Sequence, residues 1–436
     1  MILRKEIIKI GLAASAIFCI TVLHAQNGCS TLGQTPSTAF PVCGVDTFFQ
    51  ASVPVCGGKA VPVPGCNDGT VYTDLNPYWY RFTCYSSGTL AFLISPEDKN
   101  DDYDWQIFDI TNRNPDDIYT DPSMFVSCNW SGRQGNTGAS AAGTGLNNCA
   151  GTAYPLFSTT PNIIQGHEYL LLISHFDGSS QSGYDLSFSG GTANITDPIP
   201  PDILSATANC EGTQLRVNIN KKMRCASLAS GGSDFKLSVA GIAISSATGE
   251  GCSTSFDMDS IVLNLSAPLP PGIHQLIIQT GTDGNTILDN CGTSIVVGRS
   301  IDFTVYARQA TPFDSLAAVG CAPKSLKLIF KKNIKCSSIA ANGSDFIVAG
   351  PFPVTVSSAN GVCSNGLTNI ISVNLSSPIV QEGTYTIQLR TVIDGNTILD
   401  ECGEETPAGA TLSFTVKDTV SADFTYLRKE GCEHDT

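Results

Sequence analysis

The densest group of side chains that could do chemistry is acidic and lies in the stretch PEDKNDDYDW, which begins at Pro96. Calcium takes roughly six to eight oxygen ligands and tolerates irregular geometry, so closely spaced carboxylates are typical ligands for it. The EF-hand spacing D-x-D-x-D-G is absent, and a solvated acidic loop is the competing interpretation. We expect no certain cofactor and keep calcium as the one candidate. Its predicted ligands are Asp98, Asp101, Asp102 and Asp104.

A second candidate site is a sugar-stacking surface built on tryptophan. Aromatic planes bind the C–H face of sugar rings, and nearby polar side chains fix the hydroxyl groups. Trp79 and Trp105 stand among apolar or aromatic neighbours, which is typical of a sandwich core. Trp130 lies in the glycine-rich stretch CNWSGRQGNTG and is therefore the candidate for an exposed, glycan-binding ring.

A third candidate is a loop that the chain makes twice, as TDGNTILDNCG at 282–292 and IDGNTILDECG at 393–403. Three short oxygen-bearing side chains spread over seven residues give too few cation ligands without other loops. We predict instead that D-G-N forms a turn with positive φ after the penultimate strand, and that the cysteine behind it fastens the last loop. The residues of this repeat turn are Asp283, Gly284, Asn285, Asp394, Gly395 and Asn396.

Motifs for catalysis are missing from the sequence. There is no G-x-S-x-G, no H-E-x-x-H and no P-loop. We therefore predict a protein that is not an enzyme, with no catalytic and no cofactor-binding residue. A hydrolase that uses a hidden carboxylate pair is the alternative.

The elements that position these residues belong to an exported chain. Arg4, Lys5 and Lys9 precede an apolar run at 10–23, and Ala25 offers a cleavage site. This is the pattern of a signal peptide, and the run is too short to span a membrane. We predict a mature chain that starts at residue 26, has no transmembrane span and lies outside the cell or on the outer-membrane surface.

Cysteine content agrees with export. Cys19 lies in the signal peptide, so 16 of the 17 cysteines belong to the mature chain. The reducing cytosol would not keep so many structural thiols, and we interpret them as disulfides of an oxidising compartment. Structural zinc is the weaker interpretation, because no C-x-x-C pair occurs.

Net charge limits the partners. A formal charge of −15 argues against nucleic acid, which requires clustered Lys and Arg. Charged residues make up 14% of the chain, so Ser, Thr, Asn and Gly must dominate the surface. Such a surface suits an extracellular module whose partner is a glycan or another surface protein.

An internal repeat organises the second half of the chain. The motif GSDF begins at Gly232 and again at Gly343. Within each repeat, Gly and Pro separate short runs of alternating apolar residues. Each repeat therefore predicts an antiparallel sandwich of about seven strands, of immunoglobulin size. Four cysteines recur at a spacing of 111 positions and are predicted to form structural disulfides: Cys210, Cys225, Cys252 and Cys291, then Cys321, Cys336, Cys363 and Cys402.

Pairing cannot be deduced from four cysteines, which allow three connectivities. Cys225, Cys252 and Cys291 all fall in loops at one end of the sandwich, whereas Cys210 falls at the other. Of the pairs at the shared end we favour Cys225 with Cys291 and its equivalent, Cys336 with Cys402, and the second bond of each repeat stays open. The region 26–197 has seven cysteines, so one is unpaired or bonded to another domain, with Cys29 as the candidate. We further expect Cys432 to pair with a residue beyond Thr436, in the rest of a longer polypeptide.

The stretches LIFKKNIKCSSI, from Leu328, and TYTIQLRTVIDGNTILD, from Thr384, resemble bacterial Ig-like repeats. The likeness covers Asp202 to Val416. Such domains serve as stalks and spacers on cell-surface proteins, and the resemblance implies that role here.

The region before the repeats holds all three tryptophans, and its strand-like runs predict a β-sandwich or jelly roll. CSTLGQTPSTAFPVCG, YDWQIFDIT, NWSGRQGNTGAS and GYDLSFSGGTANITDP resemble the amino-terminal region of large Bacteroidetes surface proteins. The resemblance implies PKD domains, gliding-motility association and type IX secretion. ADFTY, from Ala422, looks like the first strand of a PKD domain.

The predicted fold is all-β throughout. We predict a non-enzymatic surface protein whose amino-terminal sandwich is carried on Ig-like repeats, for adhesion or for cell-envelope and gliding-associated organisation. A carbohydrate-binding module that targets a downstream enzyme is the alternative. The predicted domains are 1–25 signal peptide, 26–197 sandwich, 198–307 first Ig-like repeat, 308–417 second repeat and 418–436 start of a PKD-like domain.

Overall fold

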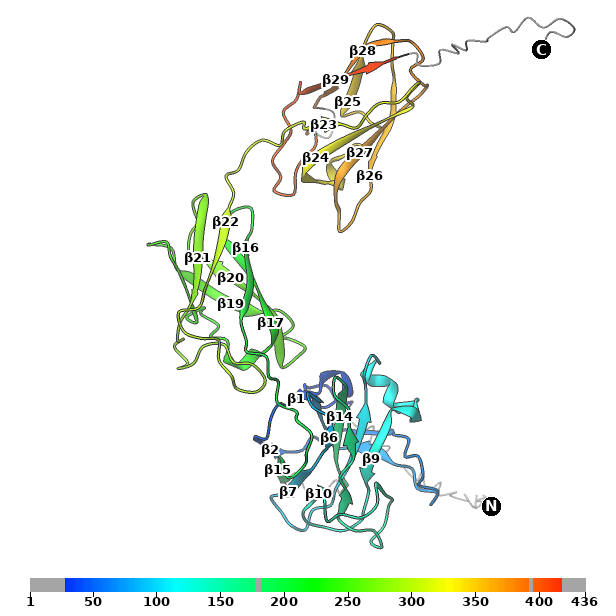
Figure 1. Cartoon of the computed structure of the whole chain (residues 1–436), viewed down its shortest axis with the longest axis vertical. Coiled ribbons are helices and arrows are strands. Elements are labelled where there is room, and N and C mark those ends of the chain that lie inside the picture. Colours follow the sequence, from blue (N-terminus) through cyan, green and yellow to red (C-terminus); the bar gives the residue numbers. More distant parts are fainter. Residues whose placement is uncertain (1–27, 177–181, 392–394, 418–436) are drawn as a thin grey trace, which may run out of the picture.

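The computed structural model describes residues 28–176, 182–391 and 395–417. The predicted signal peptide, Asp394 of the second turn and the predicted PKD-like start lie outside the described residues. Within them the chain forms a row of β-sheet modules, joined by short linkers, and no α-helix (Figure 1). The predicted all-β class with several sandwich-like units is therefore confirmed. No helical segment of this part of the chain is both long and apolar enough to cross a membrane.

The first module packs two large sheets against each other. Between them lies a core rich in aromatic rings, including Tyr80, Trp105 and Tyr184. One sheet has the order β1 (Phe40–Pro41), β5 (Pro77–Thr83), β14 (Glu168–His175), β8 (Tyr103–Asp109), β9 (Phe125–Asn129) and β11 (Asn147–Asn148). The other has the order β12 (Phe157–Thr159), β10 (Thr137–Ser140), β7 (Phe92–Pro96), β15 (Ser182–Phe188) and β2 (Thr47–Ser52).

The six-stranded sheet is covered on its outer face as well. A second core lies there, with Trp79, Phe108 and Leu172 from the sheet and Tyr72 from a covering segment. Burial of both faces explains why β14 has the continuous apolar run YLLLI instead of alternation. The smaller elements are β3 (Gly57–Ala60) with β4 (Thr73–Leu75), β6 (Gly88–Thr89) with β13 (Asn162–Ile163), and the 3-10 turns η1 (Pro36–Thr38), η2 (Pro115–Tyr119) and η3 (Pro122–Met124).

Each repeat is a sandwich of a four-stranded and a three-stranded sheet with the same strand order. Repeat 1 contains β16 (Ile203–Ala208), β17 (Gln214–Arg224), β20 (Asp257–Leu265) and β19 (Ile244–Gly249), opposite β18 (Phe235–Leu237), β21 (Gly272–Ile278) and β22 (Ser300–Val305). Repeat 2 contains β23 (Ser315–Leu316), β24 (Ser325–Lys335), β27 (Leu367–Leu375) and β26 (Val356–Gly361), opposite β25 (Phe346–Ala349), β28 (Gly383–Leu389) and β29 (Thr411–Val416). The 3-10 turns η4 (Cys225–Ser227) and η5 (Cys336–Ser338) follow their long strands.

The long strand of each repeat shows why the sequence folds this way. In β17 Leu215, Val217 and Ile219 alternate with exposed or half-buried residues and enter the core. The pairing of β17 with β20 is interrupted between Asn218 and Met223. An interruption of this kind bends a strand and releases its side chains from the regular pleat.

Each repeat has one internal disulfide, and it differs from the predicted one. Cys225 bonds to Cys252, and Cys336 bonds to Cys363. The predicted pairs with Cys291 and Cys402 are therefore wrong. The physical reason is local, because the turn after β17 lies against the β19–β20 connection, where the N–H of Cys225 donates to the carbonyl of Phe256 (2.8 Å).

The first module has two internal disulfides, Cys29–Cys56 and Cys66–Cys149. The expectation that Cys29 is unpaired or bonded to another domain is therefore wrong, and Cys43 has the cross-domain role. Cys84 and Cys128 are buried thiols, so the interpretation of the mature cysteines as disulfides is wrong for these two. Burial raises the pKa of both.

Candidate functional site: the clamped module junctions

One buried aspartate fixes the repeated loop. In repeat 1 Asp289 is 1% exposed, and its Oδ1 accepts hydrogen bonds from the N–H of Cys291 (2.9 Å) and from a second loop amide (2.8 Å). In repeat 2 Oδ1 of Asp400 accepts a bond from the N–H of Cys402 (2.9 Å) and one from another amide (2.7 Å). A carboxylate that accepts two loop amides fixes the backbone that carries the cysteine.

A lysine completes the pair in both repeats. Nζ of Lys221 lies 2.7 Å from Oδ2 of Asp289, and Nζ of Lys332 lies 2.6 Å from Oδ2 of Asp400. Both lysines lie in the interrupted part of the long strand, which explains how they reach the loop at the end of the sandwich. Sequence reasoning missed them, although the two lysines share the 111-residue spacing of the cysteines.

The same lysines bind the linker that enters the repeat. Lys221 donates to the carbonyl of Ile199 (2.8 Å) and pairs with the carboxylate of Asp197 (2.7 Å). Lys332 donates to the carbonyl of Gln309 (3.0 Å). Each linker is thus held on the Lys–Asp pair of the repeat that it enters.

The two junctions distribute their linker charges differently. Arg308 occupies the position equivalent to Asp197, and it pairs with Glu404 at 2.5 Å. Glu404 in turn stands where repeat 1 has Thr293. The linker therefore carries an anion at the first junction and a cation at the second, and each has an opposite charge in the repeat that follows.

The pKa shifts of two junction carboxyls agree with ion pairs between charged groups. Burial raises the pKa of the Asp197 carboxyl, but hydrogen bonds from Lys221 and from the N–H of Ile199, together with the charge of Lys221, outweigh it, so the net pKa is lowered. Burial and Lys332 act in the same opposed way on Asp400, whose pKa is also lowered. Both carboxyls are therefore ionised at neutral pH.

A disulfide joins each loop to the preceding module. Cys291 of repeat 1 bonds to Cys43 of the first module, and Cys402 of repeat 2 bonds to Cys210 of repeat 1. The prediction that this cysteine fastens the loop of its own sandwich is therefore wrong. The described residues contain six disulfides, a number typical of an exported protein.

The D-G-N turn precedes this loop. Gly284 and Gly395 have φ of +87° and +84°, a region that L-residues rarely adopt. In repeat 1 the N–H of Gly281 donates to the carbonyl of Asn285 (2.7 Å), which closes the turn. The side chain of Asp283 is exposed, so it does not take part in the junction.

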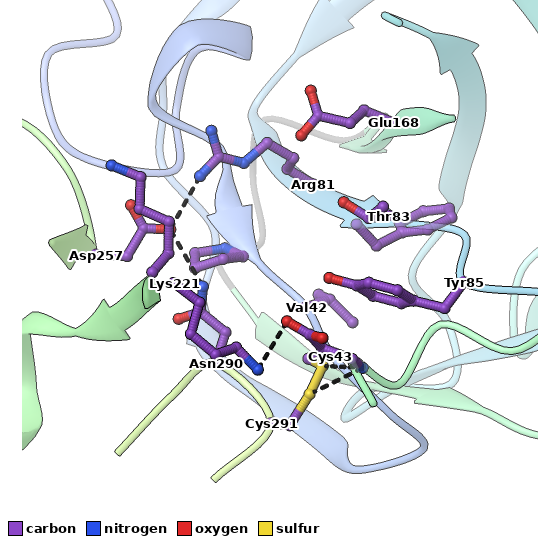
Figure 2. A pocket seen from close by; sticks show the side chains of 14 residues that line it. Val42, Cys43, Arg81, Thr83, Tyr85, Glu168, Lys221, Asp257, Asn290 and Cys291 are labelled. Atoms are coloured by element: carbon purple, nitrogen blue, oxygen red, sulfur yellow. Dashed lines mark hydrogen bonds and ion pairs between the residues drawn. A yellow bond between two sulfur atoms is a disulfide. The ribbon is translucent and has the colours of Figure 1, made fainter. Parts of the chain in front are cut away.

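The first junction is lined by a partly open pocket of about 280 Å³ (Figure 2). On its wall Nη2 of Arg81 lies 3.0 Å from Oδ2 of Asp257, which joins the first module to repeat 1. Phe40 and Phe256 add an edge-to-face contact across the same boundary, with ring centroids 4.9 Å apart. Tyr85 also lines the pocket, and burial together with Asp197 raises its pKa to about 12.

The four predicted calcium ligands have different surroundings. Asp98 is exposed, and Asp101 is buried with Oδ2 3.6 Å from Nε2 of His175. Burial raises the pKa of Asp102 to about 6 and that of Asp104 well above its usual value. Residues 28–176, 182–391 and 395–417 contain no group of three or more His, Cys, Asp or Glu side chains placed to hold a metal. Calcium binding stays a prediction.

Trp130 is buried at 6% exposure, which corrects the expectation of an exposed ring. Its Nε1 donates to Oε1 of Gln106 (3.1 Å), and its ring packs 5.2 Å from that of Tyr72. The glycine-rich context is misleading because Trp130 extends β9 into the outer core. Trp79 and Trp105 are each 0% exposed, in agreement with their predicted core positions.

No protein-family profile matches the chain, and no curated protein matches it. Among solved structures, the N-terminal part of the bacterial S-layer protein SbsC aligns with a TM-score of 0.21 and 10% identity, over 50% of this chain and 45% of that one. A longer part of the same S-layer protein gives 0.20 and 11%, over 50% and 32%. A biofilm-associated protein, BSP domain, gives 0.17 and 9%, over 86% and 67%.

These likenesses amount to a distant structural similarity to bacterial S-layer and biofilm-associated surface proteins. The chain spans less than half the length of the two S-layer structures. TM-scores this low carry no information about the function of this chain.

Proposed function

We propose that this chain is a non-enzymatic surface protein in which two Ig-like repeats form a clamped stalk for the amino-terminal sandwich. The observation that carries the proposal is the repeated junction, where the same Lys, Asp and Cys hold the linker and the preceding module. A set of contacts made twice at one spacing serves the arrangement of the modules, whatever each module binds.

Neighbouring modules joined by a linker and a disulfide have less freedom to rotate than modules joined by a linker alone. A linker alone leaves neighbouring modules free to swing, which is the usual behaviour of domains with small interfaces. A disulfide at a second point, Cys43–Cys291 or Cys210–Cys402, removes most of that rotation. The stalk would then hold the first module at a fixed distance and orientation.

The finer role that we propose is adhesion or organisation of the cell envelope, including gliding-associated organisation on a Bacteroidetes-type surface. The partner would be an extracellular glycan or another surface protein, recognised by the first module. The junction residues support the stalk and do not identify this partner.

Small-angle X-ray scattering of the oxidised chain tests the clamp. We expect a narrow distribution of maximum dimensions in the natural chain and a broader one in Cys43→Ser/Cys291→Ser. The matched control, Cys225→Ser/Cys252→Ser, removes a disulfide inside one repeat and should leave the distribution unchanged. A junction variant as narrow as the natural chain contradicts the clamp.

Surface location needs a separate test. Protease treatment and antibody labelling of intact cells should reach the natural chain before lysis, whereas a cytoplasmic marker should stay protected. A chain that becomes accessible after lysis alone would refute the surface role.

A further inference from the structure

We infer that the two junction disulfides also make the stalk a load-bearing tether whose extension is limited by covalent bonds. The inference extends the proposed stalk function and names the mechanical role of its junctions. It depends on the order in which the four junction cysteines occur along the chain.

The two disulfides are interlaced. Cys43 pairs with Cys291 across 248 positions, and Cys210 pairs with Cys402 across 192. Cys210 lies inside the loop that Cys43–Cys291 closes, and Cys402 lies beyond it. The two disulfide-closed loops therefore overlap between Cys210 and Cys291. Neither can be extended independently of the other.

Interlacing creates a short covalent path for tension. A pull between Cys43 and Cys402 passes through the first disulfide to Cys291, back through repeat 1 to Cys210, and through the second disulfide to Cys402. The rest of the first module after Cys43 lies off this path, as does repeat 2 before Cys402. Those parts can keep their folds while the stalk is under load.

The length of this path is small. Cys210 and Cys291 are 81 positions apart, and Cys225–Cys252 shortens the route by its span of 27, which leaves 54. At about 3.5 Å per extended residue the path reaches roughly 190 Å. Without disulfides, the 359 positions from Cys43 to Cys402 would reach roughly 1,250 Å.

Repeat 1 is loaded from its two ends. Cys210 lies four positions before β17, and the far end of β17 contacts the loop of Cys291, where the N–H of Arg224 donates to the carbonyl of Leu288 (2.8 Å). Tension between the two cysteines therefore acts along β17, which pairs with both β16 and β20. Hydrogen bonds loaded along a strand share the force, whereas those pulled open at one end break one by one.

Single-molecule pulling of the full oxidised chain, held at its two ends, tests the inference. The comparison is with a variant in which Cys43, Cys210, Cys291 and Cys402 are all changed to Ser. We expect the released length at least to double in the variant, because its path between positions 43 and 402 is shortened by internal disulfides alone. Cys225→Ser/Cys252→Ser is the control and should add at most 27 residues.

A natural chain that releases as much length as the four-cysteine variant overturns the inference. Failure of the variant to fold does not obscure the result, because the natural chain alone must stop extending once the predicted path between Cys43 and Cys402 and the segments outside these two cysteines are extended. The outcome is also independent of surface labelling, so failure of the tether and failure of the surface role are distinguishable.

Discussion

Lys221 and Asp289 lie 2.7 Å apart at the base of repeat 1, with the lysine side chain 10% exposed and the aspartate 1% exposed. The pair recurs 111 positions later as Lys332 and Asp400 at 2.6 Å. A buried lysine requires its partners, because an unpaired charge in the interior is costly. The Lys–Asp pair therefore holds the loop and the linker by noncovalent bonds, at the same junction where the disulfide joins the loop to the preceding module.

Asp289→Ala should lower the free energy of unfolding of repeat 1 by about 3 kcal/mol, because a buried ammonium loses a partner and two loop amides lose their acceptor. Urea unfolding, monitored by hydrogen exchange in peptides from repeat 1, measures the change in the free energy of unfolding. The control is Asp259→Ala, which breaks the exposed Lys222–Asp259 pair (2.8 Å) and should cost less than about 1 kcal/mol. Equal effects of the two variants would contradict the buried pair.

Gly284→Ala should destabilise repeat 1 by roughly 1 to 2 kcal/mol, because an L-residue is strained at positive φ. A Cβ there meets no atom within 4 Å, so the effect reports the backbone alone. Gly231→Ala is the matched control, since that site is equally open and has no left-handed φ. Thermal unfolding compares the stabilities of the two variants. If Gly231→Ala is as unstable as Gly284→Ala, the positive φ of Gly284 is not the cause of the destabilisation.

Asp102 should make the first module less stable as pH rises. Its pKa in the folded chain, about 6, lies above the usual 3.8, so the contribution is complete below pH 3.8 and is lost as pH rises through 6. Asp102→Asn should weaken this dependence and stabilise the module at pH 7.5 by about 1 kcal/mol, a value reduced for partial exposure. Melting temperatures from pH 4 to 8 test the sign, with exposed Asp98→Asn as control.

Calcium offers a separate test of the acidic loop. If the loop binds calcium, millimolar calcium should raise the melting temperature of the first module, because a ligand that binds the folded state alone stabilises it. Asp102→Asn should abolish the increase, since a neutral amide is the weaker ligand. A melting temperature that is unchanged by calcium and by chelation would identify a solvated loop.

Much of the fold was predictable because its causes are local. Alternating apolar residues in stretches such as QLRVNIN dictate strands that bury one face, and the 111-residue spacing of the cysteines shows that one sandwich is made twice. Even the linker charges have a sequence signature, since Asp197 and Arg308 stand at equivalent positions. No comparison of the two repeats, however, could show what those residues touch.

The sequence by itself determined an all-β chain with a duplicated module and a repeated loop. The tertiary structure decided the partners of that loop, because Cys291 bonds to a residue 248 positions away in another module. Such pairing depends on which loop ends meet when whole sandwiches are placed end to end. The same reason applies to Trp130, whose burial comes from segments that cover β9 and not from its glycine-rich neighbours.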